Sequence, residues 1–374
     1  MIVLIGGKIF TGEEFIENGA IFIENGKIVK VLRRKRLPAN VEVIDLKGKY
    51  ILPGFIDPHT HIGMRDEGAP REYSDVNEAT DPATPHLYAL DAYNPLDPAV
   101  DKALRSGITT VFITPGSANP IGGVGSVIKL KNAPISEIVV KKEAGLKMAL
   151  GENPKLTYRE KKSFPSTRMA TAAIIREWFT KAKRYGEEKK RKEKDPKLEN
   201  ILKVLRKEIP CRIHCHSVQD IETALRLKEE FGFEMILEHA SDAPLIVEKL
   251  KGKVKGIVVG PLFGVSSKPE SKNLSFENPA RLSAHGIPIA ITSDHPFNAI
   301  YHLNLYAAMS FKEGLDEITA LKAITSTPAE FLGVSDRVGY IKKGYDADIV
   351  VFSGHPFDIM SRVEMVFIDG VRVV

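Results

Sequence analysis

The chain contains 374 residues, of which 43% are hydrophobic and 27% are charged, as is typical of a soluble globular protein. Its net charge of +5 is small for this length, and acidic residues are interleaved with basic ones even in the most basic stretch, 181–207. We therefore expect a solvated helical face there and no nucleic-acid partner. The sequence has no run of about 18 apolar residues and no signal peptide, which predicts no membrane partner.

Amide and cysteine usage bear on the source and the compartment. Lys and Glu are abundant, whereas Gln219 is the only glutamine; this bias is thermophile-like. The two cysteines, Cys211 and Cys215, do not form a disulfide framework. We therefore expect a reducing, cytoplasmic location.

Both chain ends contain short apolar runs separated by turn residues. Residues 2–5, 20–23 and 27–32 are predicted strands, and Asn25-Gly26 predicts a tight hairpin between the last two. The runs 347–352 and 363–373 are similar, with a second hairpin at Asp369-Gly370. Since neither end could bury a sheet alone, we expect residues 1–50 and 338–374 to pair into one small β-sandwich domain.

Between the ends, in residues 51–337, strand-like runs alternate with helical patterns, which indicates a parallel α/β architecture. Candidate strands lie at residues 55–57, 109–114, 126–130, 145–150, 211–214, 235–239, 256–259 and 287–292. This pattern favours a (β/α)8 TIM barrel with insertions. The alternative is a doubly wound open sheet, but no Gly-x-Gly-x-x-Gly turn opens a first βα unit.

Residues able to bind metal follow these strands, at the barrel face that carries active sites. His59 and His61 are two apart, so in extended chain both project to the same side. Two such imidazoles are ready ligands for Zn²⁺, although a His-x-His pair alone is often incidental. His214 and His239 each end a later strand, and His216 shares the face of His214.

Two further positions carry charge into apolar strands. Asp294 closes the last strand, where a buried carboxylate is costly unless a cation or hydrogen-bond donors compensate it. Lys147 interrupts the fourth strand. It either faces outward, or it is carboxylated by CO2 so that its carbamate bridges two metal ions. Glu152 is the alternative bridging carboxylate.

Taken together, these motifs resemble the amidohydrolase superfamily, in its imidazolonepropionase-related branch. The resemblance rests on the N-terminal GGKIFTG and NGKI, on the block ILPGFIDPHTH at 51–61, on TSTPA at 325–329 and on GYIKKGYDADIVV at 339–351, and it spans nearly the whole chain. Carried over, it makes His59, His61, Lys147, His214, His239 and Asp294 the metal ligands. His216 competes with His214 for the fifth-strand position, and members with one metal lack the lysine bridge.

The resemblance implies a hydrolase that attacks a C–N bond with metal-activated water, using one or two divalent ions, most simply Zn²⁺. Asp294 would be the general base, and His216, if not a ligand, would hydrogen-bond the developing oxyanion. The implied substrate is a small molecule: a cyclic amide, an N-acyl compound or a dipeptide-like molecule. Homo-oligomers are common among such proteins.

Two alternatives remain at this point. One is a mononuclear deaminase that acts on a nucleobase-like ring without Lys147. The other is a catalytically inactive scaffold protein, which is disfavoured because each expected position carries a residue able to bind metal. The long loop 63–98 follows the first barrel strand and is expected to overhang the site, with Arg65, Arg71 and His86 as candidate specificity residues.

Overall fold

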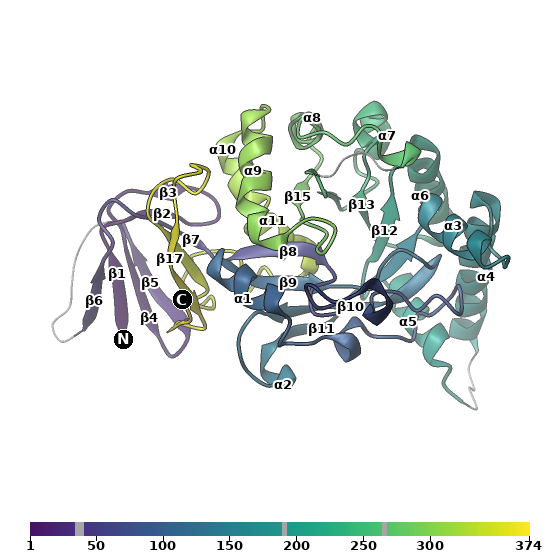
Figure 1. Ribbon diagram of the computed structural model, residues 1–374, viewed down its shortest axis with the longest axis horizontal. Coiled ribbons are helices and arrows are strands. Elements are labelled where there is room, and N and C mark those ends of the chain that lie inside the picture. Colours follow the sequence, from purple (N-terminus) through teal and green to yellow (C-terminus); the bar gives the residue numbers. More distant parts are fainter. Residues whose placement is uncertain (34–40, 189–192, 264–267) are drawn as a thin grey trace.

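The structure, a computed structural model, describes residues 1–33, 41–188, 193–263 and 268–374. Part of the basic stretch noted above, residues 189–192, lies outside this description. Figure 1 shows a barrel surrounded by helices, with smaller sheets beside it that contain both chain ends. No helix in the described ranges is long and apolar enough to cross a membrane.

Two small sheets are built from the ends of the chain. One contains strands from the N-terminal end alone, in the order β5-β4-β1-β6; these are β1 (Ile2–Ile5), β4 (Ala20–Glu24), β5 (Lys27–Leu32) and β6 (Glu42–Asp45). The other combines both ends in the order β18-β17-β16-β7-β2-β3; these are β2 (Lys8–Phe10), β3 (Phe15–Ile16), β7 (Tyr50–Pro53), β16 (Ile349–Phe352), β17 (Val363–Ile368) and β18 (Val371–Arg372). One apolar cluster joins them, including Leu4, Ile21, Ile51 and Ile349.

Both predicted hairpins are present. Asn25 and Gly26 have φ values of 50° and 77°, and Asp369 and Gly370 have φ values of 49° and 72°. Two successive left-handed residues are what a two-residue type I′ turn requires. The division of the chain at residues 50/51 and 337/338 stays a prediction.

The barrel prediction is confirmed. Eight strands form one sheet in the order β15-β14-β13-β12-β11-β10-β9-β8, and their bounds are β8 (Phe55–Thr60), β9 (Ile108–Ile113), β10 (Ile121–Lys129), β11 (Val139–Ala149), β12 (Cys211–Cys215), β13 (Met235–His239), β14 (Gly256–Val259) and β15 (Ile289–Ile291). Asp57 of β8 closes the ring, because it accepts hydrogen bonds from Thr292 Oγ1 (2.6 Å) and from the Ser293 backbone N–H (3.1 Å) just beyond β15.

One strand runs against the expected direction. β10 pairs antiparallel with both β9 and β11, whereas the other neighbouring pairs in this sheet are parallel. Residues 122–125, glycine-rich enough to read as a tight turn, are instead part of β10. The glycines allow close packing here: a side chain on Gly125 would collide with Phe112, and one on Gly123 with the Leu87 carbonyl.

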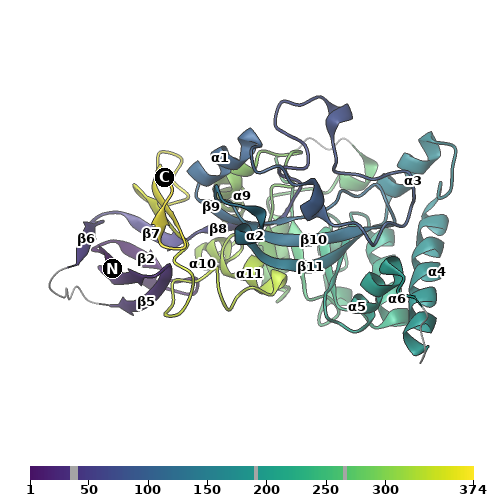
Figure 2. The same ribbon diagram turned by 90° about the horizontal axis from the view of Figure 1, so that it is seen from below.

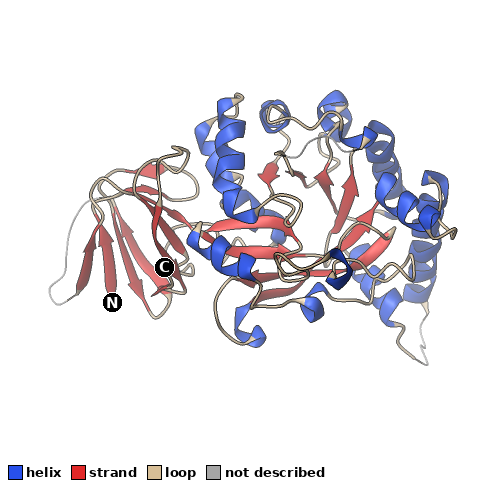
Figure 3. Cartoon of the chain, viewed as in Figure 1, coloured by secondary structure: helices blue, strands red, loops and turns tan. Residues whose placement is uncertain are grey.

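Helices cover the outside of the barrel strands (Figures 2 and 3). They are α1 (Pro98–Arg105), α2 (Ile135–Ile138), α3 (Glu152–Glu160), α4 (Arg168–Glu187), α5 (Pro196–Leu205), α6 (Val218–Phe231), α7 (Val247–Leu250), α8 (Asn278–Ala284), α9 (Leu303–Lys312), α10 (Glu317–Lys322) and α11 (Ser326–Leu332). Their starts follow local chemistry: Asp97 and Asp195 each cap a helix whose first residue is proline.

A buried ion cluster joins the barrel to the small sheets. Lys129, at the end of β10, is 2% exposed, and its Nζ lies 2.8 Å from Asp346, 2.9 Å from Asp348 and 2.5 Å from Asp369. Burial lowers the pKa of Lys129, but the three carboxylates outweigh it and raise the pKa above its ordinary value. The ammonium therefore stays charged, and it holds the two parts of the chain together.

Candidate metal centre

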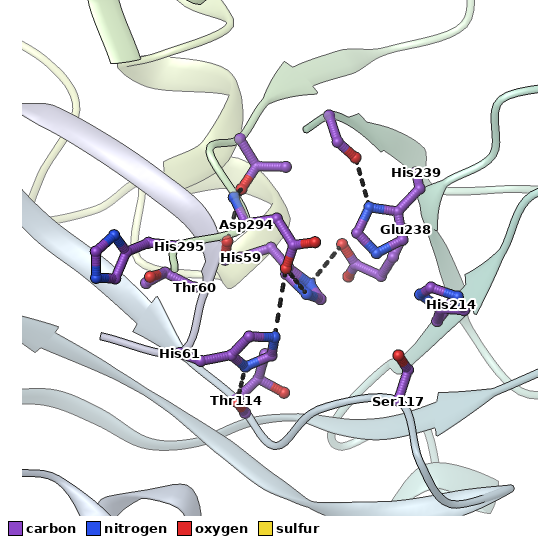
Figure 4. Close-up of polar contacts among 12 residues, drawn as sticks. His59, Thr60, His61, Thr114, Ser117, His214, Glu238, His239, Asp294 and His295 are labelled. Carbon is purple, nitrogen blue, oxygen red and sulfur yellow. Dashed lines mark hydrogen bonds and ion pairs between the residues drawn. The ribbon is translucent and has the colours of Figure 1, made fainter. Parts of the chain in front are cut away.

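Four side chains from distant parts of the chain converge at the barrel mouth (Figure 4). His59 lies on β8 and His61 just after it, while His239 ends β13 and Asp294 follows β15. One ligand atom from each of His59, His239 and Asp294 lies within 4.8 Å of the others. The His61 ring centre is 5.3 Å from that of His59. All four side chains are buried.

Backbone carbonyls fix the proton position on two of these rings. His61 Nδ1 lies 2.6 Å from the Thr114 carbonyl oxygen, and His239 Nδ1 is hydrogen-bonded to the Gly260 carbonyl oxygen. A carbonyl only accepts, so in each ring Nδ1 carries the hydrogen and Nε2 presents a lone pair. This is the arrangement that histidine ligands of metals adopt.

A carboxylate does the same for His59. Oε2 of Glu238 lies 3.0 Å from His59 Nδ1, and Oε1 accepts a hydrogen bond from the buried guanidinium of Arg212. Burial raises the pKa of Glu238, but Arg212 and His59 outweigh it and hold the pKa well below its usual range. Glu238 is therefore ionised, and it directs the lone pair of His59 Nε2 toward Asp294.

As a result, nitrogen lone pairs of two histidine rings face a carboxylate oxygen, with no hydrogen atom of these groups between them. Oδ1 of Asp294 lies 3.4 Å from His59 Nε2 and 3.3 Å from His61 Nε2, and it has no hydrogen-bond partner within the described chain. Burial lowers the pKa of His239 to about 4, with His59 and Lys147 adding to the effect. This imidazole is therefore neutral at pH 7, as a metal ligand must be. The donor set fits a borderline cation such as Zn²⁺.

Strained backbone sets the direction of two of these side chains. His239 and Asp294 have φ values of 67° and 55°, a left-handed conformation uncommon for residues other than glycine. Such strain is concentrated at functional sites. It also takes His295 out of an extended register, and Figure 4 shows the His295 ring pointing away from the Asp294 carboxylate.

Lys147 faces the same site. It is 1% exposed, and its Nζ lies 3.4 Å from His59 Nε2, so the outward-facing alternative is wrong. Burial lowers the pKa of Lys147 to about 8, although Glu238 and Asp294 oppose the shift. Part of the population is therefore a neutral amine at neutral pH. The other bridging candidate, Glu152, begins α3.

A second group of possible ligands lies on the far side of His239. It contains His214, His216 and Glu270, with one ligand atom of each within 4.8 Å of the others. The ring centres of His214 and His239 are 4.6 Å apart, and His216 stacks on His239 at 5.1 Å and 11°. Both candidates for the fifth-strand position thus lie beside the first group.

Three supporting residues were missed from the sequence. Glu238 precedes His239, Arg212 precedes His214 by two, and Glu270 lies in a 3-10 turn (Pro269–Ser271) after β14. Strand alternation holds a usable signal for Glu238, since a charged residue in an apolar strand needs a partner. Nothing in the sequence connects Glu270 to the histidines.

The loop 63–98 covers a cavity of about 290 Å³. Met64, Val76 and Leu87 contribute apolar walls, and Gly122 forms part of the lining. A Cβ on Gly122 would lie 3.5 Å from Lys147 Cβ, so the cavity reaches the strand that carries Lys147, although none of the proposed metal ligands lines it. Of the specificity candidates, Arg65 lines a different cavity of about 240 Å³ beside His295.

Comparison with known proteins identifies the family. The sequence model of the Amidohydrolase family matches residues 50–373, and that of the NagA composite domain matches residues 1–51. A solved amidohydrolase structure from Thermotoga maritima MSB8 is similar over 100% of both chains, with 46% identity and a TM-score of 0.96.

Curated relatives are more distant. The chain is 25% identical to imidazolonepropionase of Thermoplasma acidophilum over 96% of its own length and 87% of that protein. It is 29% identical to amidohydrolase tasK of Hapsidospora irregularis over 94% of its own length, but spans only 39% of tasK. The chain belongs to the amidohydrolase family, in its imidazolonepropionase-related branch, and is a hydrolase of carbon–nitrogen bonds other than peptide bonds.

Proposed function

We propose that this protein hydrolyses a cyclic amide, an N-acyl compound or a dipeptide-like small molecule, using two divalent cations, preferably Zn²⁺. One observation carries the proposal: Asp294 Oδ1 lies 3.3–3.4 Å from two Nε2 atoms whose lone pairs face it. Two lone pairs and a carboxylate oxygen repel one another unless a cation lies among them.

His59, His61, His239 and Asp294 are the proposed ligands of the first cation. Lys147, carboxylated at Nζ, is the proposed bridge to a second cation that His214 helps to hold. A bound divalent cation supplies a Lewis acid and lowers the pKa of a coordinated water to about 7.

Asp294 also serves as the proposed general base. Its carboxylate takes the proton of the attacking water and returns it to the leaving nitrogen. Burial raises the pKa of Asp294, but the contacts with His59 and His61 outweigh it and hold the pKa well below its usual range, so the carboxylate is ionised. His216 has one of two roles, set by its tautomer. If the Ser241 hydroxyl, 2.6 Å away, donates to Nδ1, then Nε2–H can donate to an oxyanion; in the other tautomer Nε2 can bind metal.

The substrate class is inferred from the cavity beside Lys147. Its walls are mainly apolar with acidic and amide groups at one side, namely Asp75, Asn77, Glu78, Asp91 and Asn119. Such a lining accommodates a small molecule that has both an apolar part and polar groups. Both cysteines are free and buried, and we propose that the enzyme works in the cytoplasm.

The direct test is a substrate screen with metal analysis. Wild-type protein and an Asp294→Asn variant would be incubated with N-acyl amino acids, dipeptides and cyclic amides after loading with Zn²⁺. We expect turnover by the wild type and a loss of about 10²-fold or more in the variant, since a general base contributes about that much. Asp101→Asn, on the surface of α1, is the matched control and should behave as wild type.

The same screen separates the mononuclear deaminase alternative. That enzyme would release ammonia from nucleobase-like rings, and a Lys147→Met variant would retain its activity. Ammonia release independent of Lys147, or full amide hydrolysis by Asp294→Asn, would overturn the proposal.

A further inference from the structure

We infer that His214, His216 and Glu270 together form a second cation site, in which Glu270 from the turn after β14 is a ligand and both histidines of β12 and its end take part. The inference rests on the proposed function in one respect, since it specifies how the second cation of that centre is held. It adds Glu270 to the ligands and resolves the choice between the two histidines by using both.

The geometry supports a three-ligand set. One nitrogen from each ring and one carboxylate oxygen lie within 4.8 Å of one another, and the two ring centres are 5.0 Å apart. The Glu270 side chain is 1% exposed. Two imidazoles and one carboxylate converging on one point with open positions suit divalent zinc, iron, manganese or cobalt.

The hydrogen bonds around these side chains leave the inward atoms free. The Glu152 backbone N–H donates to Glu270 Oε2 at 2.7 Å, whereas Oε1 is buried without a hydrogen-bond partner among the described residues. Fixing one oxygen from behind and leaving the other bare is how outer contacts orient a metal-binding carboxylate.

The two histidines differ. The Asn153 amide N–H donates to His214 Nε2 at 3.2 Å, so in this arrangement Nδ1 carries the hydrogen; Nδ1 is buried and unpartnered within the described ranges. For His216, the Ser241 hydroxyl contacts Nδ1 at 2.6 Å, which leaves Nε2. Glu270 Oε1 and His216 Nε2 are therefore available to a cation, and His214 joins them when a cation replaces the Nδ1 hydrogen or the Asn153 contact.

Charged side chains surround the proposed site. On the far side of Glu270, Arg168 contacts both Glu270 (3.5 Å) and Asp220 (3.0 Å). Lys268 donates to Asn153 Oδ1 and so faces the amide that contacts His214. Burial raises the pKa of Glu270 to about 7, so a cation bound beside it would favour the ionised form.

The position of His239 connects this site with the first. Its ring centre is 5.1 Å from that of His59 and 4.6 Å from that of His214. The two ligand sets therefore lie on either side of one imidazole, as two neighbouring cations in a single pocket require.

Cobalt titration tests the inference. Chain freed of metal by chelator would be titrated with Co²⁺, with ions counted by mass spectrometry and their ligand field followed by visible absorption. We expect two Co²⁺ per wild-type chain. Glu270→Gln, which keeps shape and removes charge, and His216→Asn should each weaken one of them about 10–100-fold and change the spectrum of that ion alone.

Two comparisons make the result decisive. Glu177→Gln, on the exposed surface of α4, is the matched control and should bind two ions as the wild type does. His61→Asn should lose the other ion and hydrolysis while keeping the Co²⁺ at Glu270. If both Glu270→Gln and His216→Asn bind two ions with unchanged affinity, the second site is refuted although hydrolysis and the first site stand. If the wild type binds no Co²⁺, both this site and the proposed function fail.

Discussion

The carboxylate of Glu238 lies 3.0 Å from Nδ1 of His59 and is at the same time hydrogen-bonded to Arg212, which is fully buried. The metal-facing nitrogen of His59 is thus controlled through the opposite nitrogen of its ring, by a carboxylate that Arg212 holds in place. Arg212 also donates to the Pro58 carbonyl at 2.6 Å, so the same guanidinium supports the backbone next to His59.

Replacing Glu238 by Gln should lower metal affinity and stability together. The His59 ring loses the carboxylate that fixes its tautomer, which costs about 10–100-fold in affinity. Arg212 loses its buried counter-charge, which costs about 3–5 kcal/mol in the free energy of unfolding. Competition with a chromophoric chelator and urea unfolding of the metal-free protein measure the two effects.

The matched control for that variant is Glu317→Gln, since Glu317 pairs with the half-buried His355 at 2.9 Å. An exposed pair contributes about 0–1 kcal/mol, so this control should unfold nearly as the wild type does. Unchanged metal affinity in Glu238→Gln would show that Glu238 does not orient His59.

Lys147 should make the metal-free protein more stable as the pH rises. Its pKa falls from 10.5 to about 8 on folding, chiefly through burial. Between these values the unfolded chain binds a proton that the folded chain does not, so the free energy of unfolding increases with pH across this window. Below about pH 8 both states bind the proton, and Lys147 no longer makes the free energy of unfolding depend on pH. Denaturant unfolding of chelated wild type and Lys147→Met between pH 7 and 10.5 isolates the effect as a difference in slope. Parallel curves would contradict the buried amine.

Carboxylation of the same lysine should depend on CO2. A neutral amine attacks CO2 to form the carbamate, so bicarbonate should raise the metal content of wild type prepared in CO2-free buffer. Nuclear magnetic resonance with ¹³C-bicarbonate should show a carbamate carbon that Lys147→Met lacks. Retention of two tightly bound ions in Lys147→Met would rule out a bridging role.

Lys129 should matter to stability far more than Lys131. Lys129→Met leaves the buried Asp346 and Asp348 without their shared cation, which should cost about 3–5 kcal/mol. Lys131 contacts Asp369 at 2.8 Å and its side chain is 24% exposed, so Lys131→Met should cost about 1 kcal/mol or less. Thermal unfolding of both variants gives the comparison, and equal midpoints would contradict a joining role for Lys129.

Residues that follow a local rule could be predicted from the sequence. His59 and His61 are two apart at the end of one strand, and His214, His239 and Asp294 each stand where an apolar run ends. The turns at Asn25 and Asp369 follow from the left-handed conformations that Asn-Gly and Asp-Gly favour. Most of the eight strands can be recognised because helical patterns separate their apolar runs, although a loop alone joins β9 to β10.

What could not be predicted depends on contacts between distant segments. The reversal of β10 involves its pairing with β9 and β11, and the glycines at 122, 123 and 125 give no period from which a direction can be read. The support of His59 by Glu238 requires two strands to be neighbours in the barrel. Glu270 reaches the imidazoles of β12 from a turn after β14, a relationship that exists only after folding.

Because β10 runs in the reverse direction, the segments before and after this third barrel strand lie at opposite ends from those of an ordinary (β/α)8 barrel. The segment before it, 114–120, opens at the mouth because Gly122 packs against Lys147, while the segment after it, 130–138, leaves from the opposite end beside Lys129 and its aspartates. A designer who assumed ordinary barrel connectivity would diversify 130–138 to alter substrate preference and would change only how the barrel attaches to its companion sheets. In this protein, selectivity would have to be engineered through 114–120.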